Sequence, residues 1–211
     1  MKIIDISWPI SEAMTEYKDG KSVKLTPTKT MEHNGVREWL LQMNNHTGTH
    51  IDGPAHFLAT GQTIDKFELQ SVIGPCRVLD LTSVTEKIMP EDLEPFGIEK
   101  NEIILLKTTN SFRQPTDNFT YNFAYISDAA AHYLAHARIK ALGFDYLGIE
   151  RNQPNHDTHK AFMQFNIPIV EGLRLGAVSA GSYFFVCLPL YAVGLDSAPA
   201  RAVLLEGVKV T

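Results

Sequence analysis

One stretch of eleven residues determines how the rest of the chain is interpreted: it reads His46-Thr47-Gly48-Thr49-His50-Ile51-Asp52-Gly53-Pro54-Ala55-His56. Three imidazoles and one carboxylate lie in it, without a cysteine. Imidazole and carboxylate suit zinc, manganese or iron, and a site without thiolates is more typical of a catalytic ion than of a structural one. The stretch therefore predicts part of a metal centre. The alternative is a polar loop whose histidines face solvent.

The backbone of this stretch can bring its four metal-binding groups together. In an extended strand, residues two apart point to the same side, so His50 and Asp52 can share one ion. Gly48 tolerates backbone angles that other residues resist, which lets the chain turn and bring the first histidine back. Gly53-Pro54 then redirects the chain and places His56 near the same point.

A second set of candidate ligands lies far along the chain. His156 and His159 begin a segment that is expected to be helical, 156–165, and Glu171 follows the apolar run 167–170. A carboxylate at the end of a buried strand is costly unless it is paired or bound to a metal. Spacing alone leaves either histidine as a possible ligand, and leaves Glu171 as either a ligand or a solvated strand end.

Two further histidines are expected to play no part in the site. His132 and His136 lie four apart on a predicted helix, as in the zinc-protease motif, but the glutamate of that motif is missing. They predict an ordinary solvated helix face. The sequence also contains no Gly-x-Ser-x-Gly elbow, phosphate loop or dinucleotide fingerprint, which argues against serine hydrolases, kinases and dehydrogenases.

Composition is that of an ordinary globular protein. The 211 residues are 44% hydrophobic and 20% charged, which predicts a single domain over 1–211. A net charge of -5 argues against nucleic acid as a partner. Asp5 interrupts any signal-peptide apolar region, and the longest apolar run, 183–195, is too short to cross a bilayer. With two cysteines, Cys76 and Cys187, expected to be buried free thiols, these features predict a soluble cytoplasmic protein without membrane partners.

Strand signals outnumber helix signals, and the second half alternates between them. This predicts the α/β class with a mixed sheet. Residues 20–35 are expected to be polar and rich in turns. Strands are expected at 2–6, 36–43, 72–81, 103–107, 141–149, 167–170, 182–188 and 202–205, and helices at 128–137, capped by Ser127, and at 156–165, with a short one opening at Pro90.

With Phe57 added, the quoted stretch resembles the His-x-Gly-Thr-His-x-Asp-x-Pro-x-His signature of the cyclase family, and all seven fixed positions match. This family includes bacterial kynurenine formamidases and isatin hydrolases. The resemblance extends along most of the chain, through Ile4-Asp5-Ile6-Ser7, Tyr125-Ile126-Ser127-Asp128-Ala129-Ala130, Leu142-Gly143-Phe144-Asp145, Glu171-Gly172-Leu173 and Ser197-Ala198-Pro199-Ala200-Arg201-Ala202. It implies a swivelling β/β/α domain with a mixed sheet and flanking helices, assembled as a homodimer or homotetramer.

The resemblance also implies the ligands of one or two divalent ions per subunit, zinc or manganese. His46, His50 and Asp52 would bind the first ion. Asp52, His159 and Glu171 would bind the second, which favours His159 over His156. His56 would be the catalytic acid/base group.

The activity implied is metal-dependent hydrolysis of a C–N amide bond in a small substrate. An aryl formamide such as N-formylkynurenine, from tryptophan catabolism, is the first candidate. The alternatives are a cyclic amide of the isatin kind, another small amide or ester, and a non-catalytic domain that binds a metal and a small molecule. Tyr17-Lys18-Asp19-Gly20 departs from the Trp-Pro-Gly-Asp of many formamidases, and 148–154 also departs from their pattern. Tyr17 and Trp39 are candidate contacts for a planar substrate, with core packing as the alternative for Trp39.

Overall fold

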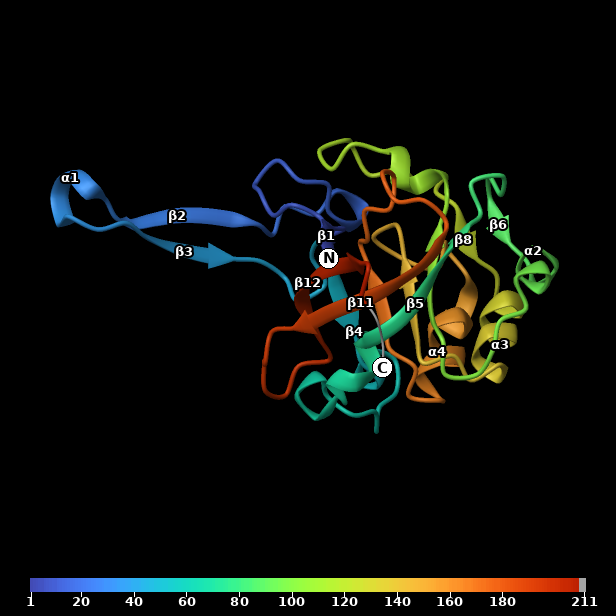
Figure 1. Ribbon diagram of the computed structural model, residues 1–211. Helices are drawn as coiled ribbons and strands as arrows, with labels where there is room; N and C mark the ends of the chain where they lie inside the picture. The colour runs from blue at the N-terminus through green and yellow to red at the C-terminus, as the bar shows by residue number, and fades with distance from the viewer. Residues whose placement is uncertain (209–211) are drawn as a thin grey trace.

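The computed structural model describes residues 1–208, and its main sheet closes on itself (Figure 1). The strands of this sheet are β1 (Lys2–Asp5), β4 (His50–Asp52), β5 (Ile73–Asp80), β7 (Ile103–Lys107), β9 (Ala141–Phe144), β10 (Ile169–Glu171), β11 (Gly181–Pro189) and β12 (Ser197–Glu206). They are ordered β1-β12-β11-β5-β7-β9-β10-β4, and β4 also pairs with β12. That last pairing makes a ring that runs from β12 through β11, β5, β7, β9 and β10 to β4 and back to β12, while β1 pairs with the other end of β12.

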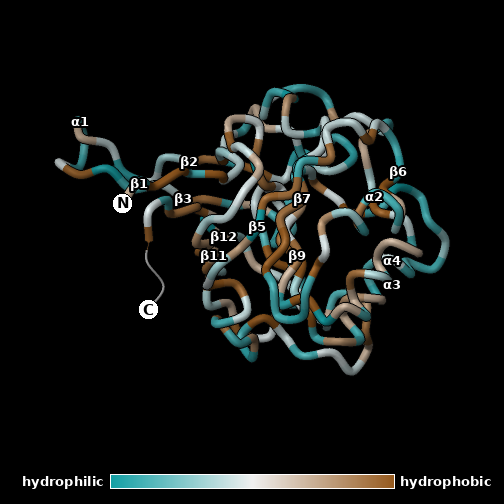
Figure 2. The backbone as a smooth tube through the Cα atoms, turned by 45° about the vertical axis from the view of Figure 1, so that its right-hand side comes forward, coloured by the Kyte–Doolittle hydropathy of each residue, from teal (hydrophilic) through white to brown (hydrophobic). Residues whose placement is uncertain are grey.

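The sheet is mixed, as the sequence predicted. Strands β5, β7, β9 and β10 run parallel, and the remaining pairs are antiparallel. All five residues of β7 are buried, as expected for a parallel strand that is covered on both faces. Ile103 and Leu105 pack in the core inside the ring, while Ile104 and Leu106 pack in a second core outside it. Hydrophobic segments accordingly gather along β5, β7 and β9 (Figure 2).

Two helices, α3 (Asp128–His136) and α4 (Asp157–Met163), cover the second core. The Ser127 hydroxyl caps α3 by accepting from the backbone N–H of Ala130, so the predicted start of this helix is confirmed. His132 and His136 are exposed on α3, which confirms the prediction of a solvated face. Among residues 1–208, no helix combines the length and the apolar character needed to span a bilayer.

Two predictions of local structure were wrong. The strand expected over 141–149 ends at Phe144, because the buried carboxylate of Asp145 accepts hydrogen bonds from Thr108 and Ser111 and draws the chain out of the ladder. The polar segment 20–35 is not merely turns. It contains β2 (Lys24–Lys29) and α1 (Met31–Asn34), and β2 pairs with β3 (Glu38–Gln42).

Strands β2 and β3, with α1 at the tip, form a hairpin that projects from the molecule (Figure 1), and we call residues 24–42 the arm. All residues of the arm except Leu25 are exposed, including the apolar side chains of Trp39, Leu40 and Leu41. A smaller pair of strands, β6 (Lys87–Ile88) and β8 (Tyr125–Ile126), and helix α2 (Pro90–Leu93) complete the fold.

The turn after β10 is pressed against the turn before β4. Gly172 has a φ of +70°, and a Cβ built there would lie 2.3 Å from the carbonyl oxygen of Gly48. Gly48 also has a positive φ, of +65°, as its place in the sequence predicted. The two glycines allow β10 and β4 to start their ladder at this point.

We expect Gly172→Ala to lower the free energy of unfolding by about 3 kcal/mol or more. A left-handed residue with a Cβ costs roughly 1–2 kcal/mol, and here the methyl group would also clash with backbone. Gly194→Ala is the matched control, because Gly194 has a φ of +83° but nothing within 4 Å of its Cβ position. Urea unfolding of both variants measures the difference. Equal losses would show that the close approach at Gly172 does not matter.

Candidate metal centre

Strand β4 presents two predicted ligands on one face. His50 and Asp52 point to the same side, whereas Ile51 between them packs in the core inside the ring. The ladder between β4 and β10 places Glu171 opposite His50 and Ile169 opposite Asp52. His50 and Glu171, which are 121 positions apart in the sequence, are therefore held side by side by the pairing of β4 with β10.

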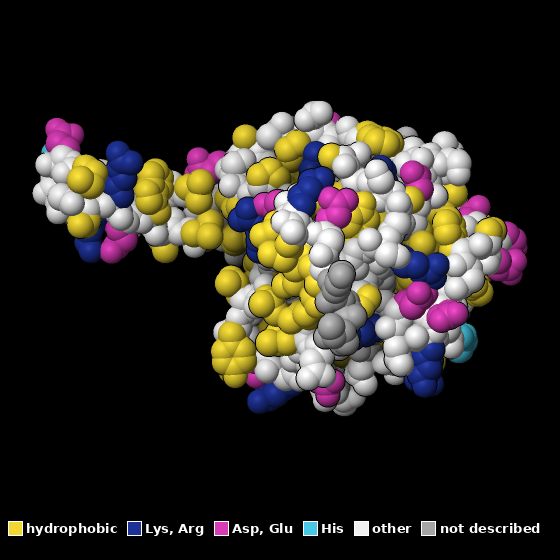
Figure 3. Space-filling model, viewed as in Figure 1, with side chains coloured by type: hydrophobic (Ala, Val, Ile, Leu, Met, Phe, Trp, Pro, Cys, Tyr) yellow, Lys and Arg dark blue, Asp and Glu magenta, His cyan; other side chains and the backbone are white. Residues whose placement is uncertain are grey.

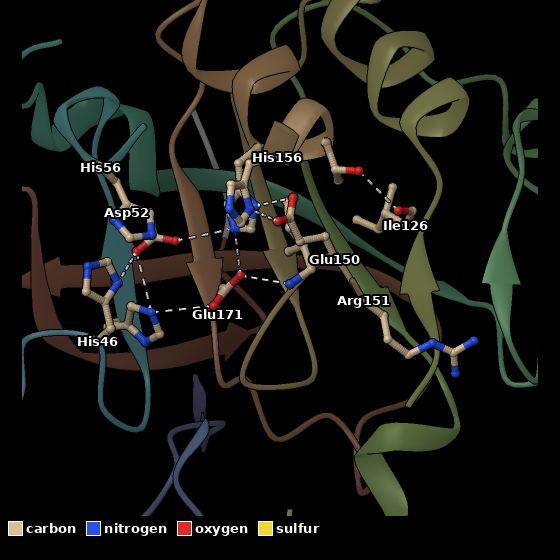
Figure 4. A network of polar contacts seen from close by, with 12 residues as sticks. His46, Asp52, His56, Ile126, Glu150, Arg151, His156 and Glu171 are labelled. Atoms are coloured by element: carbon tan, nitrogen blue, oxygen red, sulfur yellow. Dashed lines mark hydrogen bonds and ion pairs between the residues drawn. The ribbon is translucent and has the colours of Figure 1, made fainter. Parts of the chain in front are cut away.

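The carboxylate of Asp52 lies at the centre of the site (Figure 4). Its Oδ1 lies 2.9 Å from Nδ1 of His46 and 3.4 Å from Nε2 of His50. Its Oδ2 lies 4.0 Å from Nε2 of His159. His50, Asp52 and His159 are all buried, so water cannot solvate the charge of this carboxylate freely.

The carboxylate of Glu171 faces the same space from β10. Its Oε2 lies 3.5 Å from Nε2 of His50, and its Oε1 lies 3.4 Å from Nε2 of His159. The backbone N–H of Ile149 donates to Oε1 at 2.8 Å and fixes its position. Nδ1 of His50 lies 2.9 Å from the carbonyl oxygen of Gly48, so Nε2 is left for the centre of the site.

This arrangement fits a divalent cation. Oδ1 of Asp52 is fully buried and accepts no hydrogen bond from residues 1–208, although two imidazole nitrogens lie nearby. Buried polar atoms normally have partners, and this one has nitrogen and oxygen donors converging on it instead. Two sets have all their donor atoms within 4.8 Å of one another: His46, Asp52 and His56, and His50, Asp52 and Glu171. Imidazole with carboxylate is the donor chemistry of zinc and manganese.

The charges in the site raise the pKa values of two of its histidines, His46 and His159. Burial alone would lower the pKa of His46, but its contacts with Asp52 and Asp196 outweigh burial and raise it to about 9. For His159, burial is likewise outweighed by Glu150 and Glu171, and the pKa rises to about 10. The pKa of Asp52, which burial raises, falls well below its usual range beside His50 and His46. Carboxylates of this kind stay ionised and attract cations.

Asp196 belongs to the site although the sequence did not single it out. Its Oδ2 lies 2.8 Å from Nε2 of His46 and 2.9 Å from Nδ1 of His56. Burial lowers the pKa of His56, and the nearby charges do not restore it, which favours the neutral imidazole. His56 is thus oriented by a carboxylate and ready to accept a proton. It also lies close enough to His46 and Asp52 to act as a ligand.

Glu150 is the second residue that the sequence did not identify. Its carboxylate contacts both histidines that spacing had left open, His156 and His159. Only His159 reaches Asp52 and Glu171, so the structure brings His159, and not His156, to the centre. The single signal in the sequence was the departure of 148–154 from the formamidase pattern.

A cavity of about 370 Å³ opens onto these groups. Its walls include Tyr17 and Phe57, and its lining residues are Tyr17, Lys18, His46, His50, Asp52, His56, Phe57, Leu147, Gly148, Glu150, His156, His159 and Glu171. Trp39 is absent from this lining and is 57% exposed on the arm. A substrate contact of Trp39 in its own chain was therefore a wrong prediction, and so was core packing, because the arm carries this side chain away from the ring.

Comparison with known proteins places the chain in a family. Residues 4–151 match the Cyclase family model, described as "Putative cyclase". The chain belongs to this family.

Individual relatives agree with that placement. The chain is 32% identical over 209 residues to a kynurenine formamidase of Salinibacter ruber, covering 98% of each protein. Among solved structures, it is 40% identical to one described as a predicted metal-dependent hydrolase from Bacillus stearothermophilus, with a TM-score of 0.86 and coverage of 96% of this chain and 97% of that chain. Isatin hydrolase A from Ralstonia solanacearum shares the fold, with 18% identity, a TM-score of 0.83 and coverage of 97% and 92%.

We expect the affinity of the site for zinc to fall as the pH falls from about 8 to about 6. His46 and His159, with pKa values of about 9 and about 10, hold protons at neutral pH that an ion must displace. The apparent affinity should drop about tenfold per pH unit for each proton released. Chelator competition at several pH values measures the slope, and calorimetry in two buffers counts the protons. An affinity that does not change with pH would contradict this assignment of charge.

Proposed function

We propose that the chain is a metal-dependent hydrolase that cleaves a C–N amide bond in a small substrate, with an aryl formamide such as N-formylkynurenine as the first candidate. The observation that carries this proposal is the buried Oδ1 of Asp52, which lacks a hydrogen bond while imidazole and carboxylate groups surround it. The membership of the cyclase family and the kynurenine formamidase of Salinibacter ruber support it.

In this proposal the chain binds one or two ions of zinc or manganese. His46, His50 and Asp52 hold the first, and Asp52, His159 and Glu171 hold the second. Residues 1–211 form one hydrolase domain, and the protein is cytoplasmic, which is supported by Cys76 and Cys187 being buried free thiols.

The bound ion supplies a Lewis acid, which makes water acidic near neutral pH and polarises a carbonyl group. His56 acts as the general acid–base group. Its neutral imidazole takes a proton from the attacking water and then delivers it to the departing amine. Asp196 keeps the His56 ring oriented through Nδ1 and stabilises the imidazolium that forms.

The cavity suits a small planar molecule. Its volume of about 370 Å³ lies within the range of small-molecule sites, roughly 300–1,000 Å³. The rings of Tyr17 and Phe57 offer flat apolar walls beside the charged centre. Lys18 at the same cavity adds a cationic group that can contact a polar end of the substrate.

We expect purified zinc- or manganese-loaded protein to hydrolyse N-formylkynurenine faster than isatin, and to lose activity with a chelator while its circular dichroism is unchanged. His50→Ala should lose the metal and the activity, because His50 faces both Asp52 and Glu171. Metal analysis and a formate assay measure both effects. Unfolding on chelation would indicate a structural ion, and hydrolysis of isatin alone would replace the formamide with a cyclic amide.

His56→Ala is the matched control for that experiment. We expect it to keep the metal and to lose turnover by roughly 100- to 10,000-fold, the usual contribution of a general acid–base group. Loss of metal in this variant would instead make His56 a ligand, which its distance from Asp52 and His46 allows.

We also propose that the protein assembles as a homodimer or homotetramer through the arm. A two-stranded hairpin is only marginally stable by itself. This one also exposes the apolar side chains of Leu40 and Leu41, at 56% and 52%. Figure 3 shows hydrophobic side chains along the arm and on the adjoining face of the body. That face includes the loop between β11 and β12, where Leu190 and Val193 are exposed. Apolar surface of this extent is typical of an interface.

We expect the protein to elute as a multiple of its 23.6 kDa subunit, and Leu40→Ser/Leu41→Ser to elute as a monomer. Phe112→Ser is the matched control, because Phe112 is 59% exposed and lies outside the arm. Size-exclusion chromatography with light scattering measures the mass. A monomeric wild-type protein, or a variant whose mass is unchanged, would contradict this role of the arm.

A further inference from the structure

The carboxylate of Glu150 contacts two imidazoles at the edge of the candidate metal centre (Figure 4). Its Oε2 lies 2.8 Å from Nδ1 of His159, and its Oε1 makes a short contact with Nδ1 of His156. Glu150 is 7% exposed and His159 is 6% exposed, whereas the side chain of His156 is 54% exposed at the cavity. The carboxylate therefore links an interior histidine to one at the mouth.

Glu150 and His159 each have a buried polar atom that requires a hydrogen-bond partner. Oε2 of Glu150 and Nδ1 of His159 are buried, and neither forms an aligned hydrogen bond with any group in residues 1–208. Each is the nearest atom that can satisfy the other, and leaving both unpaired would be costly. Because the two atoms lie 2.8 Å apart, a small rotation of the ring turns a proton on Nδ1 toward Oε2 and satisfies both. When an ion displaces the second proton, Nε2 of His159 becomes free to bind it, and this atom faces Glu171 at 3.4 Å and Asp52 at 4.0 Å.

The ring of Phe57 and the backbone around His156 also hold the two histidines in place. The ring of Phe57 packs against His156 and His159, with centroid distances of 4.5 Å and 4.7 Å. Asn155 and His156 both have a positive φ, of 65° and 56°, which non-glycine residues rarely adopt. Strained backbone of this kind persists where the surrounding contacts require it, often at functional sites. Here it brings His156 to the free oxygen of Glu150.

We propose that Glu150 is a positioning residue that holds His159 by Nδ1, so that Nε2 is presented to the metal. This inference rests on the proposed metal-dependent function. Metal-binding histidines commonly donate their second N–H to a carboxylate, and removal of that carboxylate typically weakens metal binding 10- to 100-fold. Glu150 would thus act on the ion through His159, without touching the ion or the substrate.

The test is zinc affinity, measured by competition with a chromophoric chelator. We expect Glu150→Gln to weaken binding about 10- to 100-fold. Glu86→Gln is the matched control, because Glu86 pairs with Arg151, the neighbour of Glu150, and lies outside the cavity. It should change the affinity less than about twofold. An affinity of Glu150→Gln that equals that of the wild type would overturn the inference.

His156→Ala separates the two contacts of Glu150. We expect it to change zinc affinity less than about threefold, because the contact with His159 remains. A loss as large as that of Glu150→Gln would show that the whole loop, and not the contact with His159, controls the ion, and would overturn the inference.

A measurement on the wild-type protein covers the case in which Glu150→Gln does not fold. In the zinc-loaded protein, ¹⁵N–¹H correlation spectra report which ring nitrogen of His159 carries the proton. Protonated Nδ1 and metal-bound Nε2 are expected, and the opposite tautomer would overturn the inference. If the wild-type protein binds no zinc at all, the proposed function fails. If it binds zinc and only the prediction for Glu150 is wrong, the proposed function stands.

Discussion

The pairing of the three-residue strand β4 with both β10 and β12 is the constraint on which the rest of the structure depends. It closes the main sheet, and it also takes the carboxylate of Asp52 out of water. A buried carboxylate without compensation is strongly unfavourable, so the sheet can close only because cationic and donor groups gather around it. The fold and the site are thus products of the same pairing.

Each strand of this junction contributes a different part of the site. Strand β4 gives His50 and Asp52, β10 gives Glu171, and the residue just before β12 is Asp196, whose backbone carbonyl accepts from Gly53. Backbone ladders hold these positions to within a fraction of an ångström, which is the precision that a metal centre needs. The imidazoles of His46 and His56 come from the flanking turns and are positioned instead by their contacts with Asp196.

The groups at the centre of the site bear on the type of reaction, whereas the groups at the cavity mouth bear on the choice of substrate. Imidazoles and carboxylates around Asp52 define a reaction that many small substrates could undergo. In the proposed function, the cavity mouth, with Tyr17, Lys18 and the loop at His156, would select the molecule that reaches them. Because one fold supports many substrates, membership of the family does not determine which amide is hydrolysed, and the residues at the cavity mouth would do so.

The sequence by itself determined the features that depend on near neighbours. The face shared by His50 and Asp52, the turn at Gly48, the cap of α3 by Ser127 and the bounds of β7 all follow from local backbone geometry and alternation. The candidate ligands His159 and Glu171 could be proposed only through the family resemblance, because spacing alone left them open.

Tertiary structure alone decided the rest. Asp196 reaches His46 and His56 across 150 and 140 positions, and Glu150 was hidden because a glutamate near a loop carries no local signal of its partner. The part of the arm within 20–35 was interpreted as turns, whereas its second strand was predicted at 36–43. Trp39 was interpreted as a pocket or core residue, because a ribbon exposed on both faces has no periodic pattern that shows where its side chains lie. Hydrophobic periodicity predicts which side of a helix or strand packs against the core of its own chain. It does not predict contacts between side chains of distant segments, and it does not predict surfaces that lie away from that core.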